Sequence, residues 1–230
     1  MARYKDLFFD LDHTLWDFET NSRSALEELF EDYLNPLTTS FEGFHQTYVD
    51  VNHRYWEQYR AGRVTKRDLR FGRFRDSLQR FGMQDESLTR TLAEEYVKRS
   101  PYHTALFPNT LETLSELNRK GYSMHIITNG FEEIQHIKLK ESGLRDFFEE
   151  IVTSELVSKR KPHPKIFEFA LDCANATKEE SIMIGDNLHA DILGAKQFGI
   201  DQVFFNPDGL SHEAEPTYEI TDLRQLEELL

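Results

Sequence analysis

The chain has 230 residues, enough for one large domain or two modest ones with a buried core. Its 27 basic and 41 acidic side chains give a formal net charge of −14. This charge argues against binding of a nucleic acid polymer, which needs a basic surface. With 18 Phe and 9 Tyr, the chain is too rich in aromatic residues to be disordered throughout.

Three features of the sequence bear on its compartment. No run approaches the ~18 apolar residues of a membrane span. The N-terminal residues lead directly into the first predicted strand, without an apolar leader. The single Cys173 cannot form an intrachain disulfide, and we expect it to be a small, buried, apolar residue. We therefore expect a cytoplasmic protein with no membrane partner; the oligomeric state stays open.

The first predicted strand, residues 5–9, is short and apolar and ends in the acidic run Asp10-Leu11-Asp12. Residues 18–102 differ from the rest, because they contain few β-branched runs and show helical periodicity. Breaks near Pro36, Gly62 and Gly82 predict about four helices. Since this insertion begins just after the acidic pair, we expect a separate helical lobe over the strand ends.

From residue 109 onward, strands alternate with helices. The predicted strands cover residues 123–127, 151–152, 181–184, 202–205 and 218–220. The predicted helices cover residues 110–120, 132–142 and 164–174, a segment that ends near 198, and a last segment that begins after Asp222. Repeated strand–helix units of this length imply a parallel sheet covered on both faces. The predicted fold class is α/β, a Rossmann-like doubly wound parallel sheet with an inserted helical domain.

Four polar segments lie at predicted strand ends, where ligands bind in such sheets. They are Asp10-Leu11-Asp12, Thr128-Asn129-Gly130, Lys159-Arg160-Lys161-Pro162, and Gly185-Asp186-Asn187 with Asp191. Carboxylates suit Mg²⁺, a hydroxyl and backbone N–H groups suit phosphate oxygens, and a lysine offsets charge. Each segment alone is compatible with an ordinary turn or helix cap. Together and in this order they predict a phosphoryl-transfer site.

These four segments resemble, in order, the four motifs of the haloacid dehalogenase superfamily, over essentially the whole chain. The insertion point is similar to that of the subgroup with an α-helical cap. The resemblance implies an α/β catalytic core of residues 1–15 and 105–230 and a cap of residues 16–104. The stretches at 126–131, 143–148, 165–167 and 191–195 also resemble 5'-nucleotidases that act on pyrimidine and non-standard pyrimidine nucleoside monophosphates.

The resemblance implies a role for each acidic residue. Asp10 would be the nucleophile, forming an aspartyl-phosphate, and a ligand of Mg²⁺. Asp12 would be the general acid and base, with its backbone carbonyl also on the metal. Asp186 would be the third protein ligand, and Asp191 would orient Lys161 or a metal-bound water.

The remaining motif residues would handle the phosphate. Thr128, with the backbone N–H groups of Asn129 and Gly130, would hold the transferring phosphoryl group. Lys161 would balance charge between nucleophile and phosphate. The neighbouring cations at 159–160 compete for that role, but the lysine directly before proline matches the motif.

The implied activity is Mg²⁺-dependent hydrolysis of a phosphomonoester, with a pyrimidine nucleoside monophosphate as the expected small-molecule partner. A phosphatase of phosphoglycolate or sugar phosphates is the alternative. Asp12 disfavours dehalogenation, because the superfamily's dehalogenases lack this second acid. A phosphomutase and a non-catalytic binding module stay open. The basic loop at 59–67 would suit an anionic substrate, while Trp16, Phe18, Tyr55 and Trp56 would either stack on a nucleobase or fill a helical core.

Overall fold

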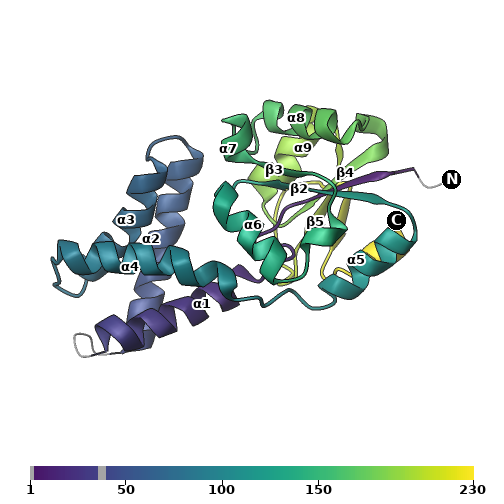
Figure 1. Ribbon diagram of the computed structural model, residues 1–230. Coiled ribbons are helices and arrows are strands. Elements are labelled where there is room, and N and C mark those ends of the chain that lie inside the picture. Colours follow the sequence, from purple (N-terminus) through teal and green to yellow (C-terminus); the bar gives the residue numbers. More distant parts are fainter. Residues whose placement is uncertain (1–2, 36–39) are drawn as a thin grey trace. The chain divides into compact units, whose positions relative to one another are not determined.

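The computed structural model describes residues 3–35 and 40–230 (Figure 1). The predicted break at Pro36 and the first two residues lie outside these ranges. The chain divides into two compact units. One is an α/β unit formed by Met1–Phe18 and Thr104–Leu230, and the other is a helical unit formed by Glu19–His103.

The α/β unit contains a six-stranded sheet in the order β3-β2-β1-β4-β5-β6, with every neighbouring pair parallel. The strands are β1 (Asp6–Phe9), β2 (Ser123–Thr128), β3 (Ile151–Thr153), β4 (Ser181–Gly185), β5 (Asp201–Phe205) and β6 (Tyr218–Ile220). The first strand of the chain is therefore central, and both of its neighbours follow the helical insertion. The predicted parallel sheet is confirmed.

Helices connect these strands. They are α5 (Thr110–Arg119), α6 (Glu132–Glu141), α7 (Ser154–Val157), α8 (Pro164–Ala174), α9 (Gly194–Phe198) and α10 (Gln225–Leu229), with 3-10 helices η3 (Arg145–Phe147) and η4 (Lys178–Glu180) and π-helix η5 (Leu188–Leu193). Gly121 and Gly143, which follow α5 and α6, have φ values of +88° and +73°. Glycine adopts this left-handed conformation readily, so both positions end a helix as predicted.

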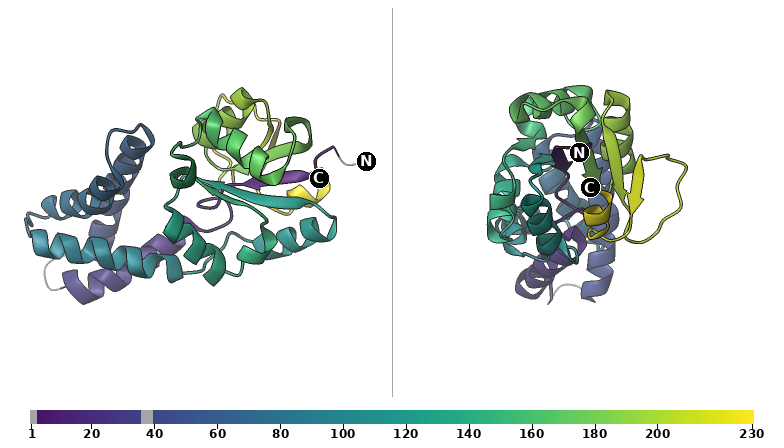
Figure 2. Two further views of the ribbon diagram at one scale, coloured as in Figure 1. Left: turned by 45° about the horizontal axis from the view of Figure 1, so that its top comes forward. Right: turned by 90° about the vertical axis from the view of Figure 1, so that its right-hand side faces the viewer.

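The two faces of the sheet are covered by different helices. Leu7 and Phe9 belong to one apolar cluster, which includes residues of α5, α6 and α10. Phe8 belongs to the opposite cluster, with residues of α8 and α9. This division follows from the alternation of side chains along a strand. Figures 1 and 2 show α8 and α9 on one side of the sheet and α5 and α6 on the other.

The helical unit is built from α1 (Phe18–Leu29), α2 (Phe41–Arg60), α3 (Lys66–Gln79) and α4 (Glu86–Arg99), with π-helix η1 (Phe30–Leu34) and 3-10 helix η2 (Ser100–Tyr102). Its core is aromatic, and Tyr48 lies 5.0 Å from Phe74 and 5.8 Å from Tyr96 between ring centroids. Arg73 is buried among these rings and donates a hydrogen bond to Asn52 Oδ1 at 3.0 Å. Its charge is thus accommodated inside the unit.

The structure overturns one expectation about a side chain and decides between two alternatives for others. Cys173 is exposed, so the prediction that it is buried was wrong. It lies in the last turn of α8, beyond the buried residues of that helix, which end at Leu171. Trp16 and Tyr55 are buried, with relative exposures of 1% and 8%, which is typical of core aromatics. Within the described ranges, no helix combines the length and apolar character needed to cross a membrane.

Candidate active site

The predicted motif residues meet at the carboxyl ends of the central strands. Asp10 follows β1, and its backbone N–H donates to the carbonyl of Ile184 in β4 at 2.9 Å. Thr128 is the last residue of β2, and Asp186 directly follows β4. Parallel strands end at one edge of the sheet, so their loops share this edge.

Lys161, in the loop between α7 and α8, lies at the centre of the site with 2% relative exposure. Its Nζ is 2.8 Å from Asp10 Oδ1 and 2.7 Å from Asp191 Oδ1. It also donates to the carbonyl of Ile127 at 2.5 Å. Burial acts to lower the pKa of Lys161, but the two carboxylates outweigh it and raise the pKa above its ordinary value. The lysine therefore stays charged, whereas Lys159 in the same loop is exposed.

Asp10, Asp186 and Asp191 form a compact acidic group, with one carboxylate oxygen of each within 4.8 Å of the others. Burial, with neighbouring carboxylates, raises the pKa of Asp10 and of Asp186 to about 6. Thr14 Oγ1 donates to Asp186 Oδ1 at 3.1 Å and helps to orient that side chain. Crowded carboxylate oxygens are the donor set that a hard divalent cation such as Mg²⁺ prefers, so these residues fit the expected metal.

Two glycines permit the close packing behind this acidic group. A Cβ on Gly185 would lie 2.4 Å from Asp191 Oδ2, so a larger residue would displace the carboxylate. Asp191 Oδ2 also accepts the backbone N–H of Asn187 at 3.0 Å. A Cβ on Gly194 would lie 2.8 Å from Cβ of Pro162, next to Lys161. The residues around Lys161 and Asp191 are therefore held by close contact with the backbone of these two glycines.

The Thr128-Asn129-Gly130 segment contacts the lysine loop through a side chain. Asn129 donates through Nδ2 to the carbonyl of Lys161 at 3.0 Å and accepts the Lys161 N–H through Oδ1 at 2.8 Å. The sequence motif indicated backbone groups here, not this amide bridge. The N–H of Gly130 donates to Thr128 Oγ1 at 3.0 Å.

Asp12 lies beside this acidic group, but its carboxylate contacts α6. Lys138 Nζ is 2.5 Å from Asp12 Oδ1, and Gln135 Nε2 donates to Asp12 Oδ2 at 2.7 Å. Burial acts to raise the pKa of Asp12, but Lys138 and Gln135 together lower it below its ordinary value. The sequence analysis did not single out either partner. The available signal was a glutamine and a lysine three residues apart on the helix that follows Thr128.

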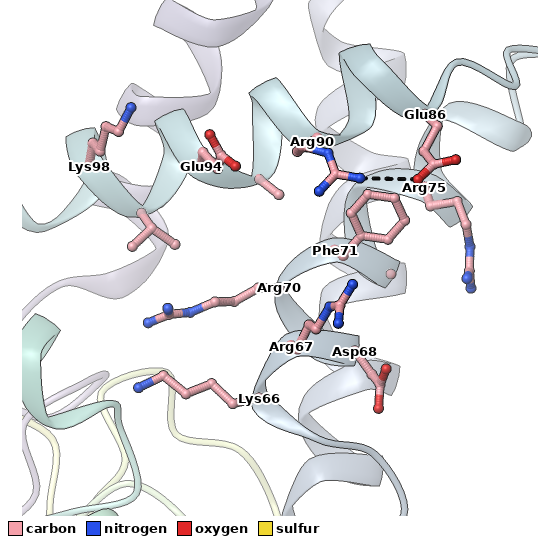
Figure 3. A pocket seen from close by; sticks show the side chains of 13 residues that line it. Lys66, Arg67, Asp68, Arg70, Phe71, Arg75, Glu86, Arg90, Glu94 and Lys98 are labelled. Carbon is pink, nitrogen blue, oxygen red and sulfur yellow. Dashed lines mark hydrogen bonds and ion pairs between the residues drawn. The ribbon is translucent and has the colours of Figure 1, made fainter.

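The helical unit has a groove of about 850 Å³ between α3 and α4 (Figure 3). Basic side chains outnumber acidic ones along it, although Arg90 pairs with Glu86 at 3.1 Å. Lys66 and Arg67, which end the basic loop noted in the sequence, lie at its lower edge in Figure 3. A basic groove is notable on a chain with a net charge of −14.

The sequence profile of the haloacid dehalogenase-like hydrolase family matches residues 7–205, which include all four motif segments. The chain belongs to this family. The recognised motifs and the observed fold agree with that assignment, and family membership makes the protein a hydrolase of the haloacid dehalogenase type.

Relatives within the haloacid dehalogenase family are similar over nearly the whole chain. The pyrimidine 5'-nucleotidase YjjG of Escherichia coli (strain K12) is 33% identical, covering 97% of this chain and 96% of the relative. A glyceraldehyde 3-phosphate phosphatase of Pyrococcus furiosus is 32% identical, covering 100% and 94%. The magnesium-bound crystal structure of the HAD-hydrolase YfnB from Bacillus subtilis superposes with a TM-score of 0.89 at 30% identity, covering 99% of both chains.

Proposed function

We propose that the chain is a Mg²⁺-dependent phosphomonoester hydrolase that works through an aspartyl-phosphate. The observation that carries this proposal is the contact of Lys161 with Asp10 and Asp191, next to Asp186, at the strand ends. A buried, charged lysine keeps a nucleophilic carboxylate beside a position where an anionic phosphoryl group must approach. Burying these charges costs desolvation free energy, and such clusters of perturbed ionisable groups are concentrated at functional sites.

In the first half of the reaction, a carboxylate oxygen of Asp10 forms a bond to phosphorus while the ester P–O bond breaks. Asp12 in its protonated form donates a proton to the departing alcohol oxygen. Its contacts with Lys138 and Gln135 favour the ionised form, so the negative charge of the bound phosphate would have to favour uptake of this proton when the substrate binds. In the second half, water attacks phosphorus, Asp12 takes a proton from it, and the bond to Asp10 breaks to release phosphate. Asp10, Asp186 and the backbone carbonyl of Asp12 would hold Mg²⁺, which supplies positive charge against the nucleophile and the phosphate.

The phosphoryl oxygens would be held by residues around the nucleophile. Thr128 Oγ1 accepts hydrogen bonds from Gly130 N–H and Gln135 Nε2, so its own hydrogen would donate to phosphate. The backbone N–H of Asn129 and the Lys161 ammonium would complete the binding of the anion. This proposal keeps the motif residues in the roles that the sequence implied.

A pyrimidine nucleoside monophosphate is the substrate class we propose, supported by the similarity to YjjG along almost all of both chains. We propose that the helical unit selects the substrate, because it carries the basic loop at 59–67, which suits an anion. The alternative is a sugar-phosphate phosphatase, because the Pyrococcus furiosus relative is nearly as similar.

The test is phosphate release from UMP, dTMP, phosphoglycolate, glyceraldehyde 3-phosphate and hexose phosphates, with Mg²⁺ and with EDTA. Asp10→Asn removes the nucleophile and should lower kcat at least about 1,000-fold. Asp172→Asn, an exposed change on α8, is the matched control and should leave activity unchanged. Metal-dependent release from UMP or dTMP supports the proposal, and release confined to the other esters supports the alternative. Full activity of Asp10→Asn, or no release from any ester, would contradict the hydrolase mechanism.

A further inference from the structure

Both oxygens of the Asp12 carboxylate are bound by side chains of α6. Lys138 Nζ is 2.5 Å from Oδ1, and Gln135 Nε2 is 2.7 Å from Oδ2. Gln135 and Lys138 are both buried, with 1% and 4% relative exposure. Two buried donors on one carboxylate fix both its position and the rotation of its plane.

The lysine is itself held in place. Its Nζ lies 3.7 Å from the ring centroid of Trp16, which is 1% exposed. A cation over an aromatic face is attracted by the electrons of the ring. Asp12 on one side and Trp16 on another therefore determine where the ammonium lies, and the ammonium in turn determines where the carboxylate lies.

Gln135 connects Asp12 to the phosphate-binding segment. The same Nε2 that donates to Asp12 also donates to Thr128 Oγ1 at 3.2 Å. A Cβ on Gly130 would lie 1.5 Å from that Nε2, so only glycine at this position lets the amide lie there. The acid and the hydroxyl expected to hold phosphate thus share one donor.

We propose that Lys138 and Gln135 are positioning residues, which hold the Asp12 carboxylate in register with Thr128 so that it meets the leaving oxygen of the substrate. This inference rests on the proposed phosphatase function. Lys138 contacts the carboxylate of Asp12, and Lys161 already compensates the charge at Asp10. The proposed contribution of Lys138 to catalysis therefore passes through Asp12, whereas Gln135 also contacts Thr128.

This dependence predicts a specific kinetic signature. An alkyl phosphomonoester, such as a nucleoside 5'-phosphate, needs a proton on its leaving oxygen, whereas the weakly basic nitrophenolate of p-nitrophenyl phosphate does not. The value of kcat/KM reports the steps up to cleavage of the ester bond. Lys138→Met should lower kcat/KM for the alkyl ester by about 10- to 100-fold. For p-nitrophenyl phosphate the loss should be under about 3-fold.

The controls separate positioning from general loss of structure. Lys140→Met changes an exposed lysine on the same helix and should not alter either substrate. Thermal melting checks that Lys138→Met is folded, and Lys138→Arg should restore part of the loss because it keeps a cation. If Lys138→Met does not fold, Gln135→Met tests the same carboxylate. Because this change also removes the hydrogen bond to Thr128, its readout is the difference between the two esters: a larger loss on the alkyl ester supports positioning of Asp12, and an equal loss on both contradicts it.

A double variant gives an independent readout. In an Asp12→Asn background, Lys138→Met should cause no further loss on the alkyl ester, since a residue that acts through Asp12 has nothing left to position. Equal losses on both esters by a folded variant, or additive effects in the double variant, would overturn the assignment while leaving the hydrolase function intact. An inactive parent protein would overturn both.

Discussion

Replacing Lys161 by Met tests whether this lysine compensates buried charge. The change removes the ammonium that lies 2.8 Å from Asp10 and 2.7 Å from Asp191. Breaking a buried ion pair by removing one partner costs about 3–5 kcal/mol. In the absence of metal, we expect the free energy of unfolding to fall by that amount at about pH 7.5.

Protonation sets a limit to this loss. An unpaired buried carboxyl escapes its penalty by taking up a proton, at a cost of about 1.4 kcal/mol for each pH unit above its pKa in the parent protein, which is about 6 for Asp10. For Asp10 the limit on the further loss is therefore about 2 kcal/mol at pH 7.5 and close to zero at pH 5.5, and Asp191, the second partner of Lys161, adds to the loss at pH 7.5. The folded variant then binds more protons than the unfolded chain, so its stability relative to the parent protein increases as pH falls.

Urea unfolding in EDTA at the two pH values measures this loss. Lys159→Met, in the same loop but exposed, is the matched control and should stay within about 0.5 kcal/mol of the parent. An equal loss at both pH values would mean that Lys161 acts by packing, not by compensating charge. A loss below about 1 kcal/mol at pH 7.5 would refute the electrostatic reasoning altogether.

Three further predictions address the metal group, its support and the lone thiol. Gly185→Ala would place a Cβ 2.4 Å from Asp191 Oδ2, so we expect the free energy of unfolding, measured in urea, to fall by about 1–3 kcal/mol. A variant as stable as the parent protein would show that the Asp191 carboxylate can move away at no cost. Calorimetric Mg²⁺ affinity should fall at least about 10-fold from pH 7.5 to pH 5, because Asp10 and Asp186, with pKa values of about 6, take up protons; a pH-independent affinity would exclude them as ligands. Because Cys173 is exposed, its thiol should be alkylated in the native protein without loss of activity, as measured by mass spectrometry. Alkylation only after denaturation would contradict this prediction.

The sequence was most informative where one periodicity dominated. The predicted helix 164–174 coincides with α8, and its predicted apolar face, from Ile166 to Leu171, is the buried one. Cys173 shows the limit of this reasoning. Its helical angle places it near Ile166, but periodicity does not tell where along a helix the packing against its neighbour ends.

The candidate site was predictable as far as its four strand-end segments, because each is contiguous in the sequence. The contacts of Asp12 with Gln135 and Lys138 could not be predicted, because the residues next to Asp12 in the sequence do not indicate a partner more than a hundred residues away. The spacing of Gln135 and Lys138 places both on one face of α6, but a lysine on such a helix normally extends to solvent, and this spacing does not show that Lys138 is buried against Trp16.

The central position of β1 also affects the order in which the protein can form during synthesis. Phe8 and Phe9, fully buried in the finished sheet, leave the ribosome long before β2 and β4 exist to receive them. The helical unit is one continuous stretch, Glu19–His103, so its residues are all available before the later strands are synthesised. β1, which leads into Asp10, is thus made before the other strands of the sheet and is paired on its second side only after β4 emerges. The nascent chain must keep this apolar segment from aggregating for most of its synthesis.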